Sequence, residues 1–155
     1  MNWRMLAMLY RNGEKYYDPT AGKALSKVMK EYEQAERQKW ARRFEIKHRP
    51  KVYVVSRYAG DIEANTAAAI RCCRFAIEQQ RIPVASHLLY PQMLNDADPA
   101  ERELGLLFGL ALMMSCEEVW CFGSELSSGM EQEMHEAKRL NKQVRYFTED
   151  MEEIV

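Results

Sequence analysis

Residues 119–143, VWCFGSELSSGMEQEMHEAKRLNKQ, join a buried strand to a helix through a short polar loop. The run 119–122 is typical of a strand, residues 123–129 are rich in Gly and Ser, and residues 130–140 favour a helix. The first turn of a helix has free backbone N–H groups and a partial positive charge, so it attracts anions. Ser127, Ser128 and Gly129 fall at this turn, and Glu133 follows one turn later. This spacing predicts a small polar pocket that holds both a carboxylate and an anion.

The same residues also fit a purely structural interpretation. Ser128 and Glu131 have the spacing of a capping box, with Ser128 as the N-cap residue and Glu131 folded back onto its amide. In that case Glu133 is a solvated helix residue. The setting of the motif in the fold has to decide between the two.

The composition describes one domain of 155 residues with an apolar content of 47% and a net charge of −1. That charge gives no global reason to expect nucleic-acid or membrane binding. The four cysteines do not form a metal signature, so we expect free thiols in a reducing cytoplasm, no metal and no cofactor. Residues 1–10 lack the apolar run of a signal peptide, and residues 104–114 are too short to span a bilayer.

Charge divides the chain into two parts. Residues 1–51 carry 13 Lys and Arg against 6 Asp and Glu, whereas residues 52–155 carry 9 against 17. Asp18-Pro19 is a usual helix opening, and residues 20–44 form a helix with a partial apolar stripe. This helix either packs its stripe on the main body or on another subunit, or serves as a nucleic-acid arm, which its interleaved glutamates disfavour. We therefore predict an N-terminal helical extension over residues 1–50.

Strands and helices alternate along the rest of the chain. Strands are expected at residues 51–56, 82–86, 119–122 and 144–147, and helices at residues 62–80, 99–114 and 130–140, with a short terminal helix in the acidic tail 148–155. The alternation predicts an α/β domain over residues 51–155, a Rossmann-like or flavodoxin-like three-layer sandwich with a four- to five-stranded parallel sheet. With strand order 2-1-3-4, the ligand crevice lies between loops 57–61 and 123–129.

Residues 104–114, LGLLFGLALMM, are apolar on almost every face of their helix. A helix of this kind has more than one apolar neighbour. Gly105 and Gly109 make a smooth groove for a close partner. We expect one face to pack on the sheet and another on a second subunit, which makes the protein a homo-oligomer.

The chain from residue 51 to residue 147 resembles the nucleoside 2-deoxyribosyltransferase-like superfamily, most closely a small bacterial and phage branch of it. The segments that carry the resemblance are VYVVSRYAGD, PVASHLL, ERELGLLFGLALM, CEEVWCFG and SSGMEQEMHEAKRLNKQVRYF, with Asn65 in the helix after the first. The resemblance covers about two thirds of the chain and does not include residues 1–50. It implies chemistry at the N-glycosidic bond of a nucleoside or nucleotide.

The resemblance also implies roles for single residues. Glu133 matches the glutamate that attacks the anomeric carbon and forms a covalent glycosyl-enzyme, and Tyr53 matches a tyrosine that orients it. The transferases have Asp-x-Gly where residues 127–129 read Ser-Ser-Gly, which is similar to the deoxynucleoside-monophosphate glycosidases, whose serine contacts the 5′-phosphate. Glu117 takes the place of an aspartate implied in base recognition or protonation, and His87 matches a histidine of the branch.

The predicted catalytic residues are thus Glu133, Tyr53 and Glu117, with Glu118 and His87 as alternative proton donors to the leaving base. The predicted substrate- and phosphate-binding residues are Ser56, Arg57, Gly60, Asn65, His87, Gly123, Ser127, Ser128 and Gly129. The expected function is an N-glycosidase or 2-deoxyribosyltransferase with a glutamate nucleophile. One alternative is a protein that binds a nucleotide or ADP-ribose-like ligand without turnover. The other is an interaction protein that assembles through the basic N-terminal helix and the apolar helix of residues 104–114.

Overall fold

The computed structural model describes residues 14, 16 and 18–154 of the chain. It divides into two compact units, Met1–His48 and Arg49–Val155. Among the described residues, no helix is both long and apolar enough to cross a membrane.

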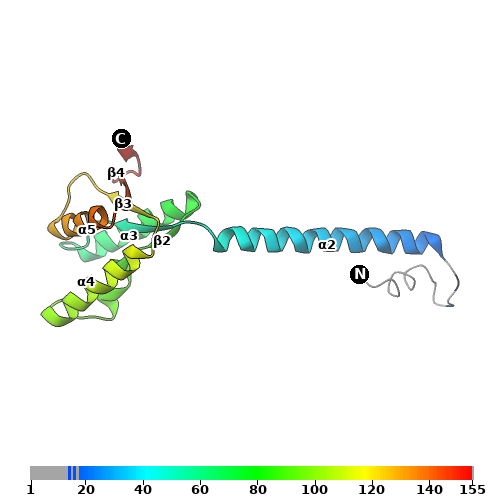
Figure 1. The fold of residues 1–155 in the computed structure, drawn as a ribbon, viewed down its shortest axis with the longest axis horizontal. Helices are drawn as coiled ribbons and strands as arrows, with labels where there is room; N and C mark the ends of the chain where they lie inside the picture. Colours follow the sequence, from blue (N-terminus) through cyan, green and yellow to red (C-terminus); the bar gives the residue numbers. More distant parts are fainter. Residues whose placement is uncertain (1–13, 15, 17, 155) are drawn as a thin grey trace. The chain divides into compact units, whose positions relative to one another are not determined.

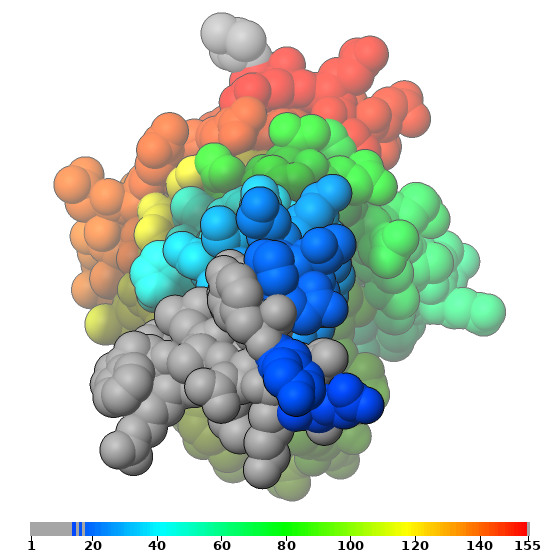
Figure 2. Space-filling model, turned by 90° about the vertical axis from the view of Figure 1, so that its right-hand side faces the viewer, coloured from blue at the N-terminus to red at the C-terminus, as the bar shows by residue number. Residues whose placement is uncertain are grey.

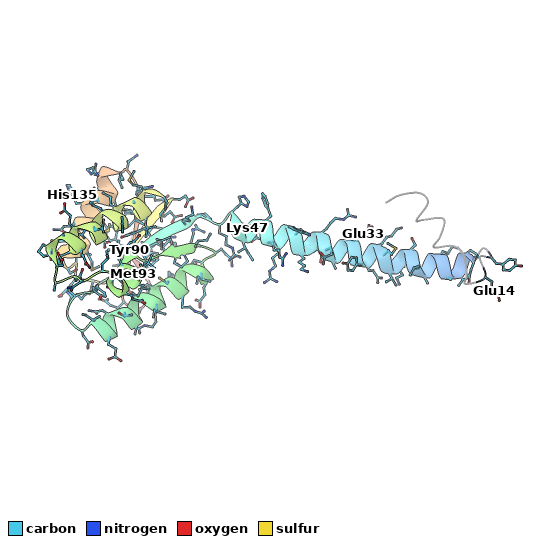
Figure 3. All side chains as sticks on the ribbon, turned by 90° about the horizontal axis from the view of Figure 1, so that it is seen from below. Glu14, Glu33, Lys47, Tyr90, Met93 and His135 are labelled. Atoms are coloured by element: carbon cyan, nitrogen blue, oxygen red, sulfur yellow. The ribbon has the colours of Figure 1, made fainter. Side chains whose placement is uncertain are left out.

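The described part of the first unit is the helix α2 (Pro19–Lys47). Its N-cap residue Asp18 accepts hydrogen bonds from the amides of Thr20 and Ala21, both at 3.0 Å, and proline occupies the first helical position. Charged side chains project from it, among them Glu33 near its middle and Lys47 at its C-terminal end (Figure 3). The exposed large apolar side chains on α2 are Leu25, Val28, Tyr32, Trp40, Phe44 and Ile46.

The second unit is built on a five-stranded sheet with the order β2-β1-β3-β4-β5. Its first four strands, β1 (Lys51–Val55), β2 (Ile82–Val84), β3 (Glu118–Phe122) and β4 (Gln143–Phe147), are parallel. The α/β class and the strand order 2-1-3-4 are therefore confirmed. In this register Tyr53 lies opposite Val84 on one side and Val119 on the other, so the carboxyl ends of β1, β2 and β3 meet at one edge.

Helices cover both faces of the sheet, which makes three layers (Figure 1). The residues of each strand alternate between the faces. Tyr53, Val55, Val119 and Cys121 pack against α4 (Pro99–Met114) and α5 (Ser128–Arg139), whose Met113, Met130 and Met134 complete that core. Val52, Val54, Trp120 and Phe122 pack on the other side against α3 (Ile62–Glu78).

Two short helical turns replace the end of the predicted second strand. β2 stops at Val84, and η1 (Ser86–Leu88) and η2 (Tyr90–Gln92) follow before α4 begins. The 3₁₀ turn brings Ser86 back over the sheet, where it is buried. The two turns carry the chain from the sheet edge to the start of α4, and the ring of Tyr90 packs on that of Phe108 at 5.4 Å between centroids.

The acidic tail does not form the expected helix. It contains β5 (Glu153–Ile154), which pairs antiparallel with the end of β4. Arg145 holds this strand with two hydrogen bonds to the Glu153 carboxylate, at 2.6 and 2.7 Å. Just before β5, Met151 packs against the core under α3, and the C-terminal segment lies beside α3 on the surface (Figure 2).

Candidate functional site

The loop from β3 to α5 lies at the carboxyl edge of the sheet, where parallel α/β sheets bind ligands. It starts at Gly123, whose φ of +119° favours glycine because a side chain there is strained. It ends at Ser127, whose hydroxyl accepts a hydrogen bond from the amide of Met130 at 3.4 Å. Ser127 is therefore the N-cap residue, and the capping box of Ser128 with Glu131 is wrong because the helix has already begun at Ser128.

One turn into α5, the carboxylate of Glu133 meets the phenol of Tyr53. The Tyr53 hydroxyl donates to Glu133 Oε1 at 2.8 Å. Tyr53 reaches this position because it is on the face of β1 that looks toward α4 and α5. A third group, the Ser86 hydroxyl, lies 2.7 Å from Tyr53 Oη. Three polar side chains from β1, η1 and α5 thus form one chain inside the apolar layer.

The surroundings of this chain set its protonation. Burial raises the pKa of the Glu133 carboxyl to about 7, and the hydrogen bond from Tyr53 opposes part of that rise. Burial, followed by the charge on Glu133, raises the pKa of the Tyr53 phenol. Tyr53 therefore remains a donor throughout the physiological range, whereas Glu133 changes charge within it.

Glu133 and the start of α5 line the same cavity, which has a volume of about 240 Å³. Ser127, Ser128 and Gly129 form one part of its wall. The first amides of α5 have no partner within the helix and carry its positive partial charge. A Cβ added at Gly129 would meet no atom within 4 Å, so its backbone is open to a neighbour. The Glu133 side chain and the first turn of α5 thus line one cavity, as the spacing in the sequence predicts.

Ser56 and His87 form a second polar pair on this cavity. The Ser56 hydroxyl lies 3.0 Å from His87 Nε2, and the ring of Tyr58 lies 6.0 Å from the imidazole between centroids. Burial lowers the pKa of His87 to about 4. The imidazole is consequently neutral at pH 7, so it offers hydrogen bonds to a ligand and no charge.

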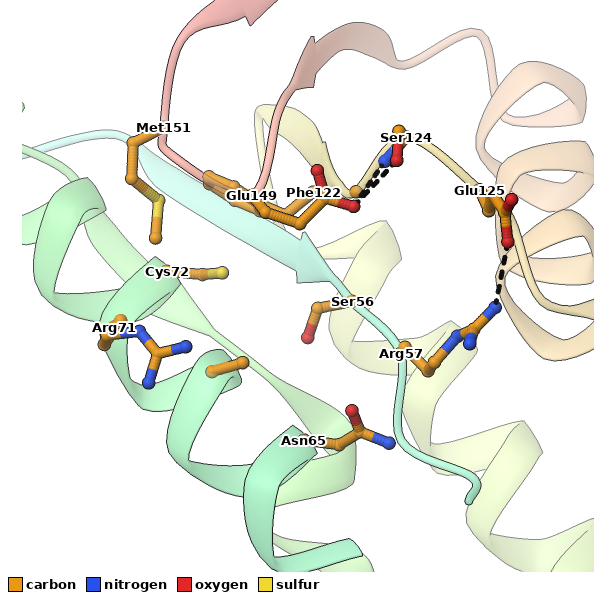
Figure 4. A pocket seen from close by; sticks show the side chains of 12 residues that line it. Ser56, Arg57, Asn65, Arg71, Cys72, Phe122, Ser124, Glu125, Glu149 and Met151 are labelled. Atoms are coloured by element: carbon orange, nitrogen blue, oxygen red, sulfur yellow. Dashed lines mark hydrogen bonds and ion pairs between the residues drawn. The ribbon is translucent and has the colours of Figure 1, made fainter. Parts of the chain in front are cut away.

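The other predicted binding residues lie around a separate cavity on the α3 side. Arg57, Asn65 and Gly123 line this cavity, which measures about 230 Å³ and which Ser56 also borders (Figure 4). Arg57 lies 4.0 Å from the carboxylate of Glu125, and Ser124 donates through its amide and its hydroxyl to Glu149. Arg57 is thus placed on the opposite side of β1 from the Glu133 cavity.

Two of these predicted residues shape the loop after β1. The side-chain amide of Asn65 donates to the carbonyl oxygens of Tyr58 and Ala59, at 3.1 and 3.0 Å. Gly60 provides the turn, with a φ of +103°. The hydrogen bonds of Asn65 and the turn at Gly60 therefore shape the loop after β1.

Glu117 lies at the wrong end of the sheet for a catalytic role. Its carboxylate accepts a hydrogen bond from the amide of Lys51, and its own amide donates to the Lys51 carbonyl. Lys51 is the first residue of β1, whereas the cavity lies beyond the last. Glu118 is at the same amino edge, where it pairs with Arg81 and with the indole of Trp120.

Sequence reasoning missed four residues of the site. Asp96 and Arg102 line the Glu133 cavity. Ser86 contacts Tyr53, and Gly109 is its close neighbour on α4. A Cβ at Gly109 would lie 3.1 Å from Tyr53 Oη. Two features of the sequence could have pointed to them: Gly109 is a glycine inside an apolar helix, and Ser86 is a polar residue at the end of a strand.

A larger groove lies between α4 and α5, next to the Glu133 cavity. It has a volume of about 640 Å³, shares Ser86 and Glu133 with that cavity, and is also lined by Tyr53. Its apolar wall contains Leu106 and Leu107, which are 55% and 56% exposed. The sheet-facing side of α4 is packed as expected, and assembly through its other side stays a prediction.

Comparison with known proteins supports the same fold. Residues 50–147 match the family model described as "Domain of unknown function (DUF7768)". No curated protein sequence matches the chain. Among solved structures, it is similar to a 2-deoxyribosyltransferase from the psychrotolerant bacterium Bacillus psychrosaccharolyticus, with 13% identity, a TM-score of 0.55, and coverage of 68% of this chain and 76% of the other. A second similar structure is a 2-deoxyribosyltransferase from Leishmania mexicana, with 14% identity, a TM-score of 0.48 and 64% coverage of each chain. The predicted 2-deoxyribosyltransferase-like fold is confirmed.

Proposed function

The chain belongs to the family described as "Domain of unknown function (DUF7768)", and we propose that its α/β domain cleaves or transfers the N-glycosidic bond of a nucleoside or nucleotide. The supporting observation is the hydrogen bond from Tyr53 to Glu133, a residue that lines one cavity together with the start of α5. The bacterial structure of similar fold is of a 2-deoxyribosyltransferase. Glu133 is the proposed nucleophile.

The proposed reaction proceeds in two displacements. One carboxylate oxygen of Glu133 bonds to the anomeric carbon as the C–N bond breaks, and the electron pair of that bond leaves on the base nitrogen. Water or a second base then displaces the carboxylate and takes the sugar. Tyr53 orients Glu133 and stabilises its ionised form. Because Glu133 must be ionised, its raised pKa makes the reaction faster above pH 7 than below it.

A phosphate on the sugar has a natural place at the start of α5. Ser128 and Gly129 line the cavity in the first turn of α5, where the backbone amides carry a positive partial charge that suits an anion. The Ser127 hydroxyl accepts from Met130 and keeps its own hydrogen for a phosphate oxygen. Arg102, which lines this cavity, supplies the positive charge that was expected from Arg57.

The leaving base requires a hydrogen bond or a proton. Of the three donors considered from the sequence, only His87 lines the cavity. A neutral imidazole with a pKa of about 4 donates a hydrogen bond, but it does not hold a proton to release at pH 7. The proposal therefore assigns His87 to base binding and solvent to final protonation of the base.

A panel of ribo- and deoxyribonucleosides and their 5′-monophosphates tests this function. The assay measures the free base released, and intact-protein mass spectrometry detects a glycosyl adduct. Glu133→Gln should abolish release and adduct, whereas Glu131→Gln, an exposed position two residues earlier on α5, should change neither. Base release that is equal in the wild type and Glu133→Gln contradicts the proposal.

Binding without turnover is the second candidate. The neutral state of His87 favours binding without turnover, because a neutral imidazole does not protonate a poor leaving group at pH 7. Isothermal calorimetry with nucleotides and ADP-ribose, followed by chromatography of the recovered ligand, separates the two functions. Tight binding with intact ligand supports the second function. If no ligand of the panel shifts the melting temperature, both functions are contradicted.

Assembly through α4 is the partner proposal that the fold supports. Leu106, Leu107 and Phe108 are large apolar side chains exposed on one helix. Burying them against a second copy removes apolar surface from water. Light scattering coupled to size-exclusion chromatography measures the oligomeric state, and Leu107→Glu should shift it toward the monomer. A monomeric wild type would refute the assembly.

A further inference from the structure

Ser86 and Gly109 both lie close to the hydroxyl of Tyr53. Ser86 Oγ lies 2.7 Å from Tyr53 Oη, and the two groups are buried. Gly109 of α4 faces the same atoms: a Cβ there would lie 3.1 Å from Tyr53 Oη and 3.4 Å from Ser86 Oγ. The absence of a side chain at Gly109 leaves the space in which the two hydroxyls meet.

The number of hydrogens fixes the direction of this chain when Glu133 is ionised. A phenol has one hydrogen to donate, and that of Tyr53 goes to the Glu133 carboxylate. The contact between Tyr53 and Ser86 then requires the serine hydroxyl as donor. Ser86 donates to Tyr53, and Tyr53 donates to Glu133. When Glu133 is protonated, its own hydrogen can point to Tyr53, and the chain can run in the opposite direction.

We infer that Ser86 is a positioning residue for Glu133: it holds the Tyr53 hydroxyl in place and strengthens its hydrogen bond to the ionised carboxylate, in a space that Gly109 keeps open. Hydrogen bonds in a chain polarise one another, so a donor to Tyr53 Oη makes the phenol a better donor. The Ser86 hydrogen bond lowers the pKa of Tyr53 against the dominant effect of burial, and the Tyr53 hydrogen bond likewise lowers that of Glu133. The inference deepens the proposed function and, for its catalytic meaning, rests on it.

Other charged and titratable groups lie around Glu133 and have to stay constant in a test. Cys121 of β3 interacts with it electrostatically. The remaining groups line the cavity or the adjoining groove and are Tyr58, His87, Tyr90, Asp96, Arg102, Glu103, Glu131, His135 and Glu136. Replacing Ser86 by Ala alters none of them.

The test is a pH titration of the Glu133 side-chain carboxyl by ¹³C NMR, in full-length protein labelled at glutamate and assigned with Glu133→Gln. Ser86→Ala should raise the Glu133 midpoint by a few tenths of a pH unit, and Ser86→Thr should restore it. Tyr53→Phe, which removes the direct donor, should raise the midpoint by about one pH unit. Ser115→Ala, which removes an exposed hydroxyl bonded to Leu112 at the end of α4, should leave it unchanged.

Gly109→Ala gives an independent second variant. Its methyl group displaces the Tyr53 hydroxyl while every polar group stays present, so the midpoint should again rise. A Ser86→Ala midpoint equal to that of the wild type, beside a raised Tyr53→Phe midpoint, overturns the inference. So does a Ser86→Thr protein that titrates like Ser86→Ala.

The titration needs no substrate, which separates this inference from the proposed function. If the midpoint moves and no variant releases base, the Ser86–Tyr53–Glu133 chain stands and the glycosidic activity fails. If the wild type releases base and the midpoint does not move, the activity stands and the role of Ser86 fails. If both stand, the acid limb of kcat/KM in Ser86→Ala should shift to higher pH by the amount that NMR records.

Discussion

Replacing Glu133 with Gln should stabilise the protein at alkaline pH and have its smallest effect near pH 4. Burial raises the pKa of the folded-state carboxyl to about 7, from an ordinary value of 4.5. Below pH 4.5 the folded and unfolded chains both hold the proton. As the pH rises from 4.5 to 7, the unfolded chain releases its proton first, so the wild type loses stability relative to the glutamine variant.

The size of the effect follows from this difference in pKa. At about 1.36 kcal/mol per pH unit, the difference between 4.5 and about 7 corresponds to about 3 kcal/mol in the free energy of unfolding. Glutamine has nearly the same shape and can donate from its amide to Tyr53 Oη, so the packing is preserved. The gain should be complete above about pH 8 and nearly absent below the unfolded-state pKa.

Urea denaturation followed by circular dichroism, at half-unit steps of pH between 4 and 9, measures this difference. Glu131→Gln serves as the control, because that exposed glutamate loses no comparable hydration on folding. A wild-type-minus-variant difference that stays constant across the range would refute the reasoning. It would mean that Glu133 is ionised in the folded protein well below pH 7.

Further predictions concern other parts of the site. Base release by the wild type should rise with pH through about 7 as Glu133 ionises, and a profile set instead by a group near pH 4 would contradict the role of Glu133. Burial lowers the pKa of His87 to about 4, so stability should fall as the pH drops from 6.5 to 4; His87→Gln should lessen this fall in urea titrations, and His135→Gln, at an exposed site on α5, should not. Gly123→Ala should destabilise by about 1 kcal/mol because of its positive φ, whereas Gly129→Ala, in the first turn of α5 with open space around it, should be neutral or stabilising; thermal unfolding of the two proteins compares them. Deleting residues 1–48 should leave the second unit folded, with amide NMR shifts of the strands preserved, since the two units are separately compact.

The layered fold could be predicted from the sequence because its signals are local and repeated. Alternation of short β-branched runs with helical periods specifies a parallel sheet, and the Asp-Pro helix openings at residues 18 and 98 mark the starts of α2 and α4. The meeting of Tyr53 with Glu133 followed from the family resemblance and from the rule that ligands bind at the carboxyl edge. These parts depend on chain order, which is visible in the sequence.

The errors arose where side-chain direction or a single residue of register decides. Two adjacent serines both suit an N-cap, and only the backbone geometry selects Ser127. Arg57 lies in the loop beyond the end of β1, where strand alternation no longer fixes side-chain direction, and it lines the cavity on the α3 side. Glu117 was assigned by resemblance, although a residue that precedes a parallel strand lies at the edge opposite to the ligand. The contact of Ser86 with Gly109 joins segments that no periodic pattern connects.

The two-residue strand β5 has a role out of proportion to its length. It occupies the outward hydrogen-bonding groups at the end of β4, which would otherwise be a template for pairing with a foreign strand. The forked clasp between Arg145 and Glu153 keeps that cover in place. Removing this ion pair, for example with Glu153→Ala, would expose the hydrogen-bonding edge of β4. We then expect slow fibril formation on storage before any change at the opposite edge of the sheet, which is β2.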